Sequence, residues 1–223
     1  MLTQEKILPL ENGDRLTRAE FEHRYDHMPQ LKKAELIEGI VYMGSPVRVT
    51  HGTPHAQIIA WLGAYWTVTP GVQVADNTTV RLDFDNEPQP DALLRIEQDG
   101  RSTISEDGYI EGSPELIVEI AASSASYDLR DKLKVYCRNE VQEYLIWQMY
   151  ERHFDWFQWQ QGEYVRLEPD AEGIIRSSVF PGLWLSVPSL MVGDLMEVRQ
   201  VLELGLATVE HTMFVQQLAQ GLR

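Results

Sequence analysis

Apolar positions along this chain follow two periods, one typical of strands and one typical of helices. Short alternating or continuous apolar runs predict strands, and apolar residues three and four positions apart predict helices. The expected strands cover residues 35–43, as a hairpin, and residues 72–83, 91–96, 116–121 and 143–148. The expected helices cover residues 53–66 and 127–139. Because some successive strands have a helix between them and others do not, the pattern predicts an α/β fold with a central mixed sheet flanked by helices.

The same pattern predicts one main domain with an extension at each end. Residues 1–13 are expected to form a flexible leader, and residues 14–190 the domain. From residue 191 to residue 223, apolar residues such as Leu195, Val198 and Leu202 recur at steps of three and four, which predicts a helical extension. Its apolar face is expected to pack on the domain or on a partner subunit, since its polar face lacks the lysines of a membrane-binding helix.

Two of the predicted strands each carry one carboxylate in apolar surroundings. Asp91 begins the strand 91–96, and Glu119 lies inside the apolar run 116–121. Such a run is typical of a central strand that is buried on both faces. Because an ionised carboxylate taken out of water is costly unless it is paired, Glu119 needs a compensating charge. A divalent cation or a lysine would supply it.

The helix that follows places a lysine on the side of the sheet. At about 100° per residue, Leu129, Leu133 and Tyr136 form the stripe expected to face the strands, and Lys132 lies only about 65° from its centre. Lys134 lies about 135° from that centre, toward solvent. Lys132 is therefore the residue expected to reach the carboxylates at the strand ends.

Asp91, Glu119 and Lys132 together suit the hydrolysis of a phosphodiester. Mg²⁺ prefers oxygen ligands and binds through one or two protein carboxylates; Mn²⁺ is a second candidate ion, and the carbonyl of Ile120 is a third candidate ligand. Such an ion polarises a phosphoryl oxygen and lowers the pKa of a bound water. A nearby ammonium would orient that water or stabilise the developing charge. The expected site is that of a metal-dependent endonuclease.

Two further residues are weaker candidates for the same catalytic site. Glu35, on the predicted hairpin, could extend its carboxylate into the site or lie on a solvated face. His55, in the first turn of the predicted helix, could donate to a phosphate or assist a water, or it could be a structural cap. His51 and His55 have the spacing of a zinc pair, but Gly52 and Pro54 are expected to break the helix that such a pair needs.

Structural roles explain the same residues without catalysis. Asp91 could form a turn after Pro90. Glu119 could form a buried salt bridge with Lys132 or Arg95 and bind no metal. Lys132 could be an ordinary lysine at the edge of a helix. These alternatives stay open on the sequence alone.

Composition excludes some locations and structural classes but does not decide the function. The chain has 223 residues, a net charge of −15 and one cysteine, Cys137, which excludes an internal disulfide framework. A secretory signal is absent from the first residues, and no apolar run approaches the roughly 18 residues of a membrane span. A cytoplasmic protein without membrane association is expected. The acidic balance weighs against nonspecific binding of nucleic acid, because phosphates need basic partners, but it leaves room for a local basic groove or a metal-bridged phosphate contact.

Four segments in succession resemble one family. They are Gln89-Pro90-Asp91, Pro114-Glu-Leu-Ile-Val-Glu119-Ile, Asp128-Leu-Arg-Asp-Lys132-Leu-Lys-Val-Tyr136 and Glu143-Tyr-Leu-Ile. With these segments, and over about residues 14–190, the chain resembles the bacterial Uma-two family, which is grouped with restriction endonucleases in the PD-(D/E)xK nuclease-like superfamily.

This resemblance implies a restriction-endonuclease-like core, an Mg²⁺-dependent cleavage site and DNA as the first candidate substrate. Asp91 and Glu119 look like the two acids of the superfamily motif. Lys132 would replace the lysine that normally lies two residues after the second acid, where this chain has Ala121. Similar nucleases often act as homodimers. The alternative is an inactive relative that uses the same fold as a binding or regulatory module, since a fold does not establish a function.

Overall fold

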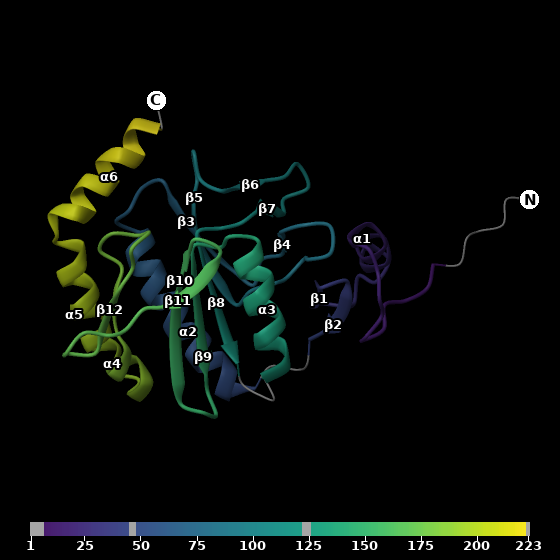
Figure 1. Ribbon diagram of the computed structural model, residues 1–223, viewed down its shortest axis with the longest axis horizontal. Helices are drawn as coiled ribbons and strands as arrows, with labels where there is room; N and C mark the ends of the chain where they lie inside the picture. Colours follow the sequence, from purple (N-terminus) through teal and green to yellow (C-terminus); the bar gives the residue numbers. More distant parts are fainter. Residues whose placement is uncertain (1–6, 45–47, 122–125, 222–223) are drawn as a thin grey trace, which may run out of the picture.

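A computed structural model of the chain describes residues 7–44, 48–121 and 126–221 (Figure 1). The helices in these ranges are α1 (Arg18–Asp26), α2 (Val49–Trp66), α3 (Ser126–Arg138), α4 (Val187–Val192), α5 (Leu195–Leu206) and α6 (Val209–Gly221). The strands are β1 (Ala34–Ile37), β2 (Ile40–Met43), β3 (Val72–Asp76), β4 (Val80–Arg81), β5 (Ala92–Ile96), β6 (Ser102–Ile104), β7 (Ile110–Gly112), β8 (Leu116–Ala121), β9 (Glu143–Gln148), β10 (His153–Gln160), β11 (Glu163–Arg166), β12 (Ile174–Arg176) and β13 (Trp184–Ser186).

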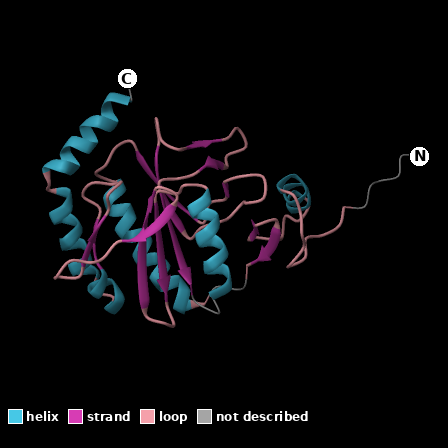
Figure 2. Cartoon of the chain, in the orientation of Figure 1, coloured by secondary structure: helices cyan, strands magenta, loops and turns pink. Residues whose placement is uncertain are grey.

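A six-stranded sheet in the order β11-β10-β9-β8-β5-β3 forms the centre of the molecule. β8 and β9 run parallel, and the other neighbours in this sheet are antiparallel. A parallel pair needs a crossover connection, which α3 supplies. Helices lie on both sides of the sheet (Figures 1 and 2). The predicted α/β fold with a central mixed sheet is confirmed.

The side chains of β8 alternate between two hydrophobic cores. Leu116 and Val118 pack in the core that includes α2, whereas Ile117 packs in the core that includes α3. Because successive side chains of a strand point to opposite faces, Glu119 lies on the α3 face, with Ile117. The strand thus holds Glu119 below the helix that carries Lys132.

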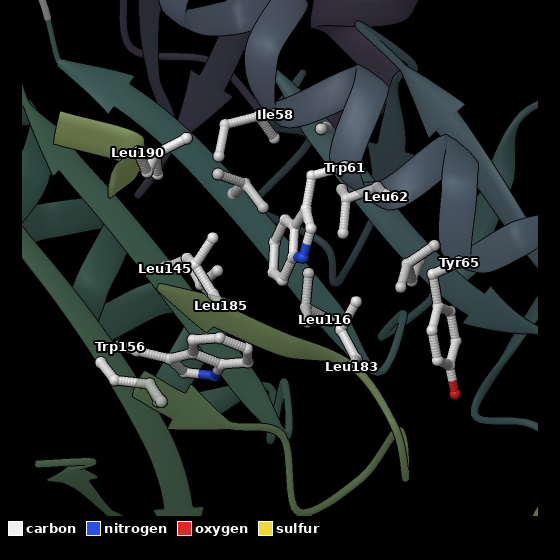
Figure 3. Close-up of a cluster of buried hydrophobic side chains, with 14 of the residues drawn as sticks. Ile58, Trp61, Leu62, Tyr65, Leu116, Leu145, Trp156, Leu183, Leu185 and Leu190 are labelled. Atoms are coloured by element: carbon white, nitrogen blue, oxygen red, sulfur yellow. The ribbon is translucent and has the colours of Figure 1, made fainter. Parts of the chain in front are cut away.

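The larger core joins α2 to the sheet and to the C-terminal part of the chain (Figure 3). The rings of Trp61 and Trp156 meet edge to face with their centroids 5.8 Å apart. The indole of Trp61 also donates to the backbone oxygen of Trp184 over 3.0 Å, so its buried N–H is paired. These contacts fix α2 against one face of the sheet.

The predicted N-terminal hairpin is present as β1 and β2 and is joined to the segment before β5. Leu36 and Glu87 exchange two backbone hydrogen bonds, of 3.1 and 2.8 Å. Leu10 and Phe21 are buried beside Leu36 in a small core of their own. Of the predicted leader, residues 1–6 lie outside the described residues, and Leu10 packs on the hairpin.

The C-terminal extension is helical, as predicted, and packs on its own domain. α5 lies against β13 and α2. α6 is attached by His211, whose Nε2 lies 3.0 Å from the buried hydroxyl of Thr69 at the end of α2. The exposed sides of these helices carry Leu204, Val209 and Met213.

The raised pKa of Glu87 predicts that the attachment of the hairpin is sensitive to pH. Burial, a hydrogen bond with the neighbouring carboxyl of Glu22 and the charge of Glu22 raise the pKa of Glu87 to about 8. The folded protein therefore holds a proton that the unfolded chain releases near pH 4.5. Because the folded state binds more protons, stability is lost as the pH rises from about 4.5 to about 8.

We expect Glu87→Gln, which cannot ionise, to gain melting temperature over the wild type at about pH 8 but much less at about pH 5. Thermal melts at both pH values measure the difference. Glu106→Gln is the matched control, because Glu106 is an exposed glutamate of the β6–β7 connection. An equal shift for Glu87→Gln at both pH values would contradict the assignment.

Candidate active site

The site forms where β5 and β8 meet, on the α3 face of the sheet. The antiparallel register pairs Ala92 with Val118. Continued by one residue, this register places Asp91 opposite Glu119. Opposed residues of an antiparallel pair project from the same face. Both carboxylates are buried, with exposed fractions of 4% for Asp91 and 7% for Glu119.

Lys132 links Glu119 to the N-terminal hairpin. Its Nζ donates to Oε1 of Glu119 over 2.9 Å and to Oε1 of Glu35 over 2.8 Å. The hydroxyl of Tyr136, one turn later in α3, donates to the same oxygen of Glu119 over 2.7 Å. The backbone amide of Gln89 donates to Oε1 of Glu35 over 2.7 Å. The ammonium thus joins α3, β8 and β1 at one buried point.

The charges of this cluster shift the pKa values of its members in a consistent direction. Burial raises the pKa of Glu119 to about 7; Lys132 opposes that shift, and the carboxylates of Asp91 and Glu35 add to it. Burial alone would lower the pKa of Lys132, but Glu119 and Glu35 raise it, so the ammonium stays charged. Ionisation of Glu119 is therefore harder in the cluster than in a free glutamate, whereas Lys132 keeps its proton more firmly than a free lysine does.

Asp91 has a separate set of partners. Its Oδ2 accepts a hydrogen bond of 2.8 Å from the backbone amide of Ile120 and lies 3.3 Å from Nε2 of His51. Its Oδ1 lies 3.8 Å from Nζ of Lys33. Burial would raise the pKa of Asp91, but the hydrogen bond with His51 and the charge of Lys33 lower it to about 2. Asp91 is thus ionised at neutral pH.

His55 lies beside Asp91 but does not touch its carboxylate. Its Nε2 is 2.8 Å from the backbone oxygen of Asp91 and 2.9 Å from the carboxylate of Asp76. The histidine that does reach the carboxylate is His51. Of the predicted site residues, the structure therefore brings Glu35, Glu119 and Lys132 into direct contact, with Asp91 opposite Glu119 and His55 behind Asp91.

The predicted first residue of α2 is wrong, and the prediction therefore left His51 outside the helix. α2 begins at Val49 and continues through Gly52 and Pro54, rather than beginning at Thr53. The helix tolerates these residues because they lie near its N-terminal end and the long buried face that follows stabilises it as a whole. The four-residue spacing of His51 and His55 was the available signal, since on one helix it brings the two rings to 5.9 Å.

The observed contacts test the two ion pairs that were alternatives for Glu119, one with Arg95 and one with Lys132. The pairing of Glu119 with Arg95 is wrong, because the Arg95 guanidinium donates to Ser102 and to Gln73. The buried ion pair of Glu119 with Lys132 is present. An ion pair of this kind is compatible with a metal site only if the carboxylate keeps an oxygen available for the metal.

The donor set fits Mg²⁺ or Mn²⁺ rather than a metal held entirely by side chains. Among the side chains that the structure describes, no group of three or more histidines, cysteines, aspartates and glutamates could hold a metal ion. Mg²⁺, however, needs only one or two carboxylates and keeps several waters. Oε2 of Glu119 and Oδ1 of Asp91 accept no hydrogen bond from the described part of the chain. Each carboxylate therefore has one oxygen anchored in the protein and one available.

Comparison with known proteins agrees with this fold. Residues 18–188 match the Uma2 family, described as "Putative restriction endonuclease". Because the match spans most of the sequence, the chain belongs to the Uma2 family. It is also similar to the crystal structure of "a putative nuclease belonging to DUF820 from Anabaena variabilis", with a TM-score of 0.57, 16% identity and coverage of 75% of this chain and 96% of that chain. At that identity the likeness supports the fold alone. The comparison with curated proteins found no match.

None of the helices in the described ranges has the length and apolar character to cross a membrane.

The Lys132 contacts predict a large loss of stability in Lys132→Met. Removing the ammonium leaves two buried carboxylates without their shared partner, which costs about 3–5 kcal/mol. Lys134→Met is the matched control: Lys134 lies two residues further along α3 with its side chain 73% exposed, and its ion pair with Asp131 is a surface pair. Urea unfolding of both variants measures the difference. Equal stability of the two variants would show that the buried bridge is not formed.

Proposed function

We propose that this protein is a divalent-metal-dependent endonuclease that hydrolyses phosphodiester bonds, with DNA as its first candidate substrate. The observation that carries the proposal is the arrangement of Asp91 and Glu119. Two buried carboxylates from neighbouring strands lie on one face of the sheet, each with one oxygen anchored and one available, beside a charged lysine. Membership of the Uma2 family supports the same reaction class.

Asp91 and Glu119 would hold Mg²⁺ or Mn²⁺ through Oδ1 and Oε2, and the carbonyl of Ile120 stays a predicted third ligand. When bound, such an ion polarises a phosphoryl oxygen and lowers the pKa of a bound water. The amide of Ile120 keeps Asp91 oriented through its 2.8 Å hydrogen bond. Tyr136 and Lys132 do the same for Glu119. The protein thereby fixes both ligands in advance, which a metal site requires.

Lys132 can position the nucleophile as well as Glu119. An ammonium has three N–H donors. Glu35 and Glu119 accept two of them, and no described residue accepts the third, which would then donate to a water or a phosphate oxygen at the site. Glu35 keeps the ammonium in place and remains a weaker candidate for a direct part in catalysis. His55 anchors the backbone of Asp91, so its proposed part is to position that residue.

The wider architecture is proposed on the same basis. Residues 14–190 would form a nuclease domain of the restriction-endonuclease type, and residues 191–223 an extension that packs on it. The exposed apolar side chains of α5 and α6 would form the interface of a homodimer. A cytoplasmic location stays a prediction.

A second candidate is a catalytically silent binding or regulatory module of the same fold. The observation in its favour is the Lys132 bridge, which already compensates Glu119 by a charged partner at 2.9 Å. In that case the buried charges serve stability alone.

Cleavage with matched variants distinguishes the two functions. We expect the wild type to cleave plasmid DNA with Mg²⁺ or Mn²⁺ and to lose this activity with a chelator. Asp91→Asn and Glu119→Gln should each reduce the rate at least about 10²-fold, because loss of a ligand removes several kcal/mol of transition-state stabilisation and each 1.36 kcal/mol is about tenfold.

Glu151→Gln is the control for these variants, because Glu151 is an exposed acid in the turn between β9 and β10. It should cleave at the wild-type rate. Cleavage that survives in Asp91→Asn would assign the activity to another site or to a contaminant. Absence of cleavage in every preparation, with the fold intact, would favour the silent module.

A further inference from the structure

A nuclease with a net charge of −15 must bring cations to the phosphate that it cleaves. Lys132 is poorly suited to that role by itself, because its ammonium is buried and held by two carboxylates at 2.8 and 2.9 Å. Two partly exposed donors, Lys33 and His51, lie at the entrance to the site beside Asp91. Neither is part of the superfamily motif that the sequence resembles.

Lys33 reaches Asp91 from the hairpin. It directly precedes β1, and its backbone oxygen accepts a hydrogen bond of 3.1 Å from the amide of Gly44, at the end of β2. Its Nζ lies 3.8 Å from Oδ1 of Asp91, and its side chain is 31% exposed. That separation is longer than a hydrogen bond, so the ammonium is attracted to the carboxylate without being locked to it.

His51 reaches the same carboxylate from the first turn of α2. Its Nε2 lies 3.3 Å from Oδ2 of Asp91, and its side chain is 21% exposed. Its Nδ1 is buried and has no hydrogen-bond partner within the described residues.

These contacts place two N–H donors from distant segments around one carboxylate. Both donors are partly exposed, and both make longer contacts than Lys132 makes with its partners. A phosphodiester has the same charge as Asp91, so either donor can move from the carboxylate to a phosphate oxygen beside it. His51 needs only an N–H for this contact.

We infer that Lys33 and His51 form the phosphate-binding pair of the active site and contact the phosphodiester that is cleaved. This inference rests on the proposed nuclease function and extends it, because it names two substrate-binding residues outside the carboxylate–lysine cluster. The recognised chemistry is the nucleic-acid backbone, so binding should be largely independent of base sequence.

The test measures binding without cleavage. The anisotropy of a fluorescent DNA duplex is followed with Ca²⁺ in place of Mg²⁺, at several salt concentrations. We expect Lys33→Met and His51→Gln to raise the Kd about five- to tenfold each, and Lys33→Met to reduce the salt slope by about 1. Lys33→Arg keeps the charge and should bind nearly as the wild type does.

Two exposed residues serve as matched controls: Lys32, which adjoins Lys33, and His23 on α1. Lys32→Met and His23→Gln should bind as the wild type does. If the wild type binds and Lys33→Met and His51→Gln equal these controls, the phosphate-binding assignment alone is wrong. If Lys33→Arg fails as Lys33→Met does, the effect comes from structure and the assignment is also wrong. If the wild type neither binds nor cleaves DNA, both the assignment and the proposed function are wrong.

Discussion

The ammonium of Lys132 is the contact on which the rest of the site depends. It satisfies Glu119 on the central strand β8 and Glu35 on the hairpin strand β1, and both acids are largely out of water. A buried carboxylate without a partner is strongly destabilising. The lysine that α3 places between the two acids supplies the positive charge that they share. The same contact orients Glu119, so that Oε1 is bound by the protein and Oε2 is available. The ion pair that stabilises the fold therefore also sets the geometry of the site.

The proposed function gives Lys132 one role and the pair of Lys33 and His51 another, and the exposure of these residues separates them. Lys132 is internal and fixed, whereas Lys33 and His51 lie at the entrance and make longer contacts with Asp91. This division would reconcile the charge of −15 with the nucleic-acid substrate that we propose. Net charge describes the whole surface, but a phosphate responds mainly to charges within about 10 Å, because salt screens those further away.

The sequence predicts the centre of the site better than its edge. Glu119 stands out because it interrupts an apolar strand, and helical geometry alone places Lys132 near it; the contact between them is present, while its catalytic role stays a prediction. The opposition of Asp91 and Glu119 depends on the register of two strands joined by a long excursion, which local periodicity does not encode. Lys33 lies outside any periodic segment. Gly52 and Pro54 predict that the helix begins after His51. The buried face of α2 stabilises the helix despite these two residues, so His51 lies in its first turn.

The central claim is that Asp91 and Glu119 share a divalent cation, and anomalous scattering from a crystal of the protein grown with Mn²⁺ tests it most directly. The account predicts one anomalous peak in contact with both carboxylates, with Lys132 still bridging Glu35 and Glu119. A well-ordered crystal without a peak at these carboxylates, or with Mn²⁺ bound elsewhere in the molecule, would contradict it.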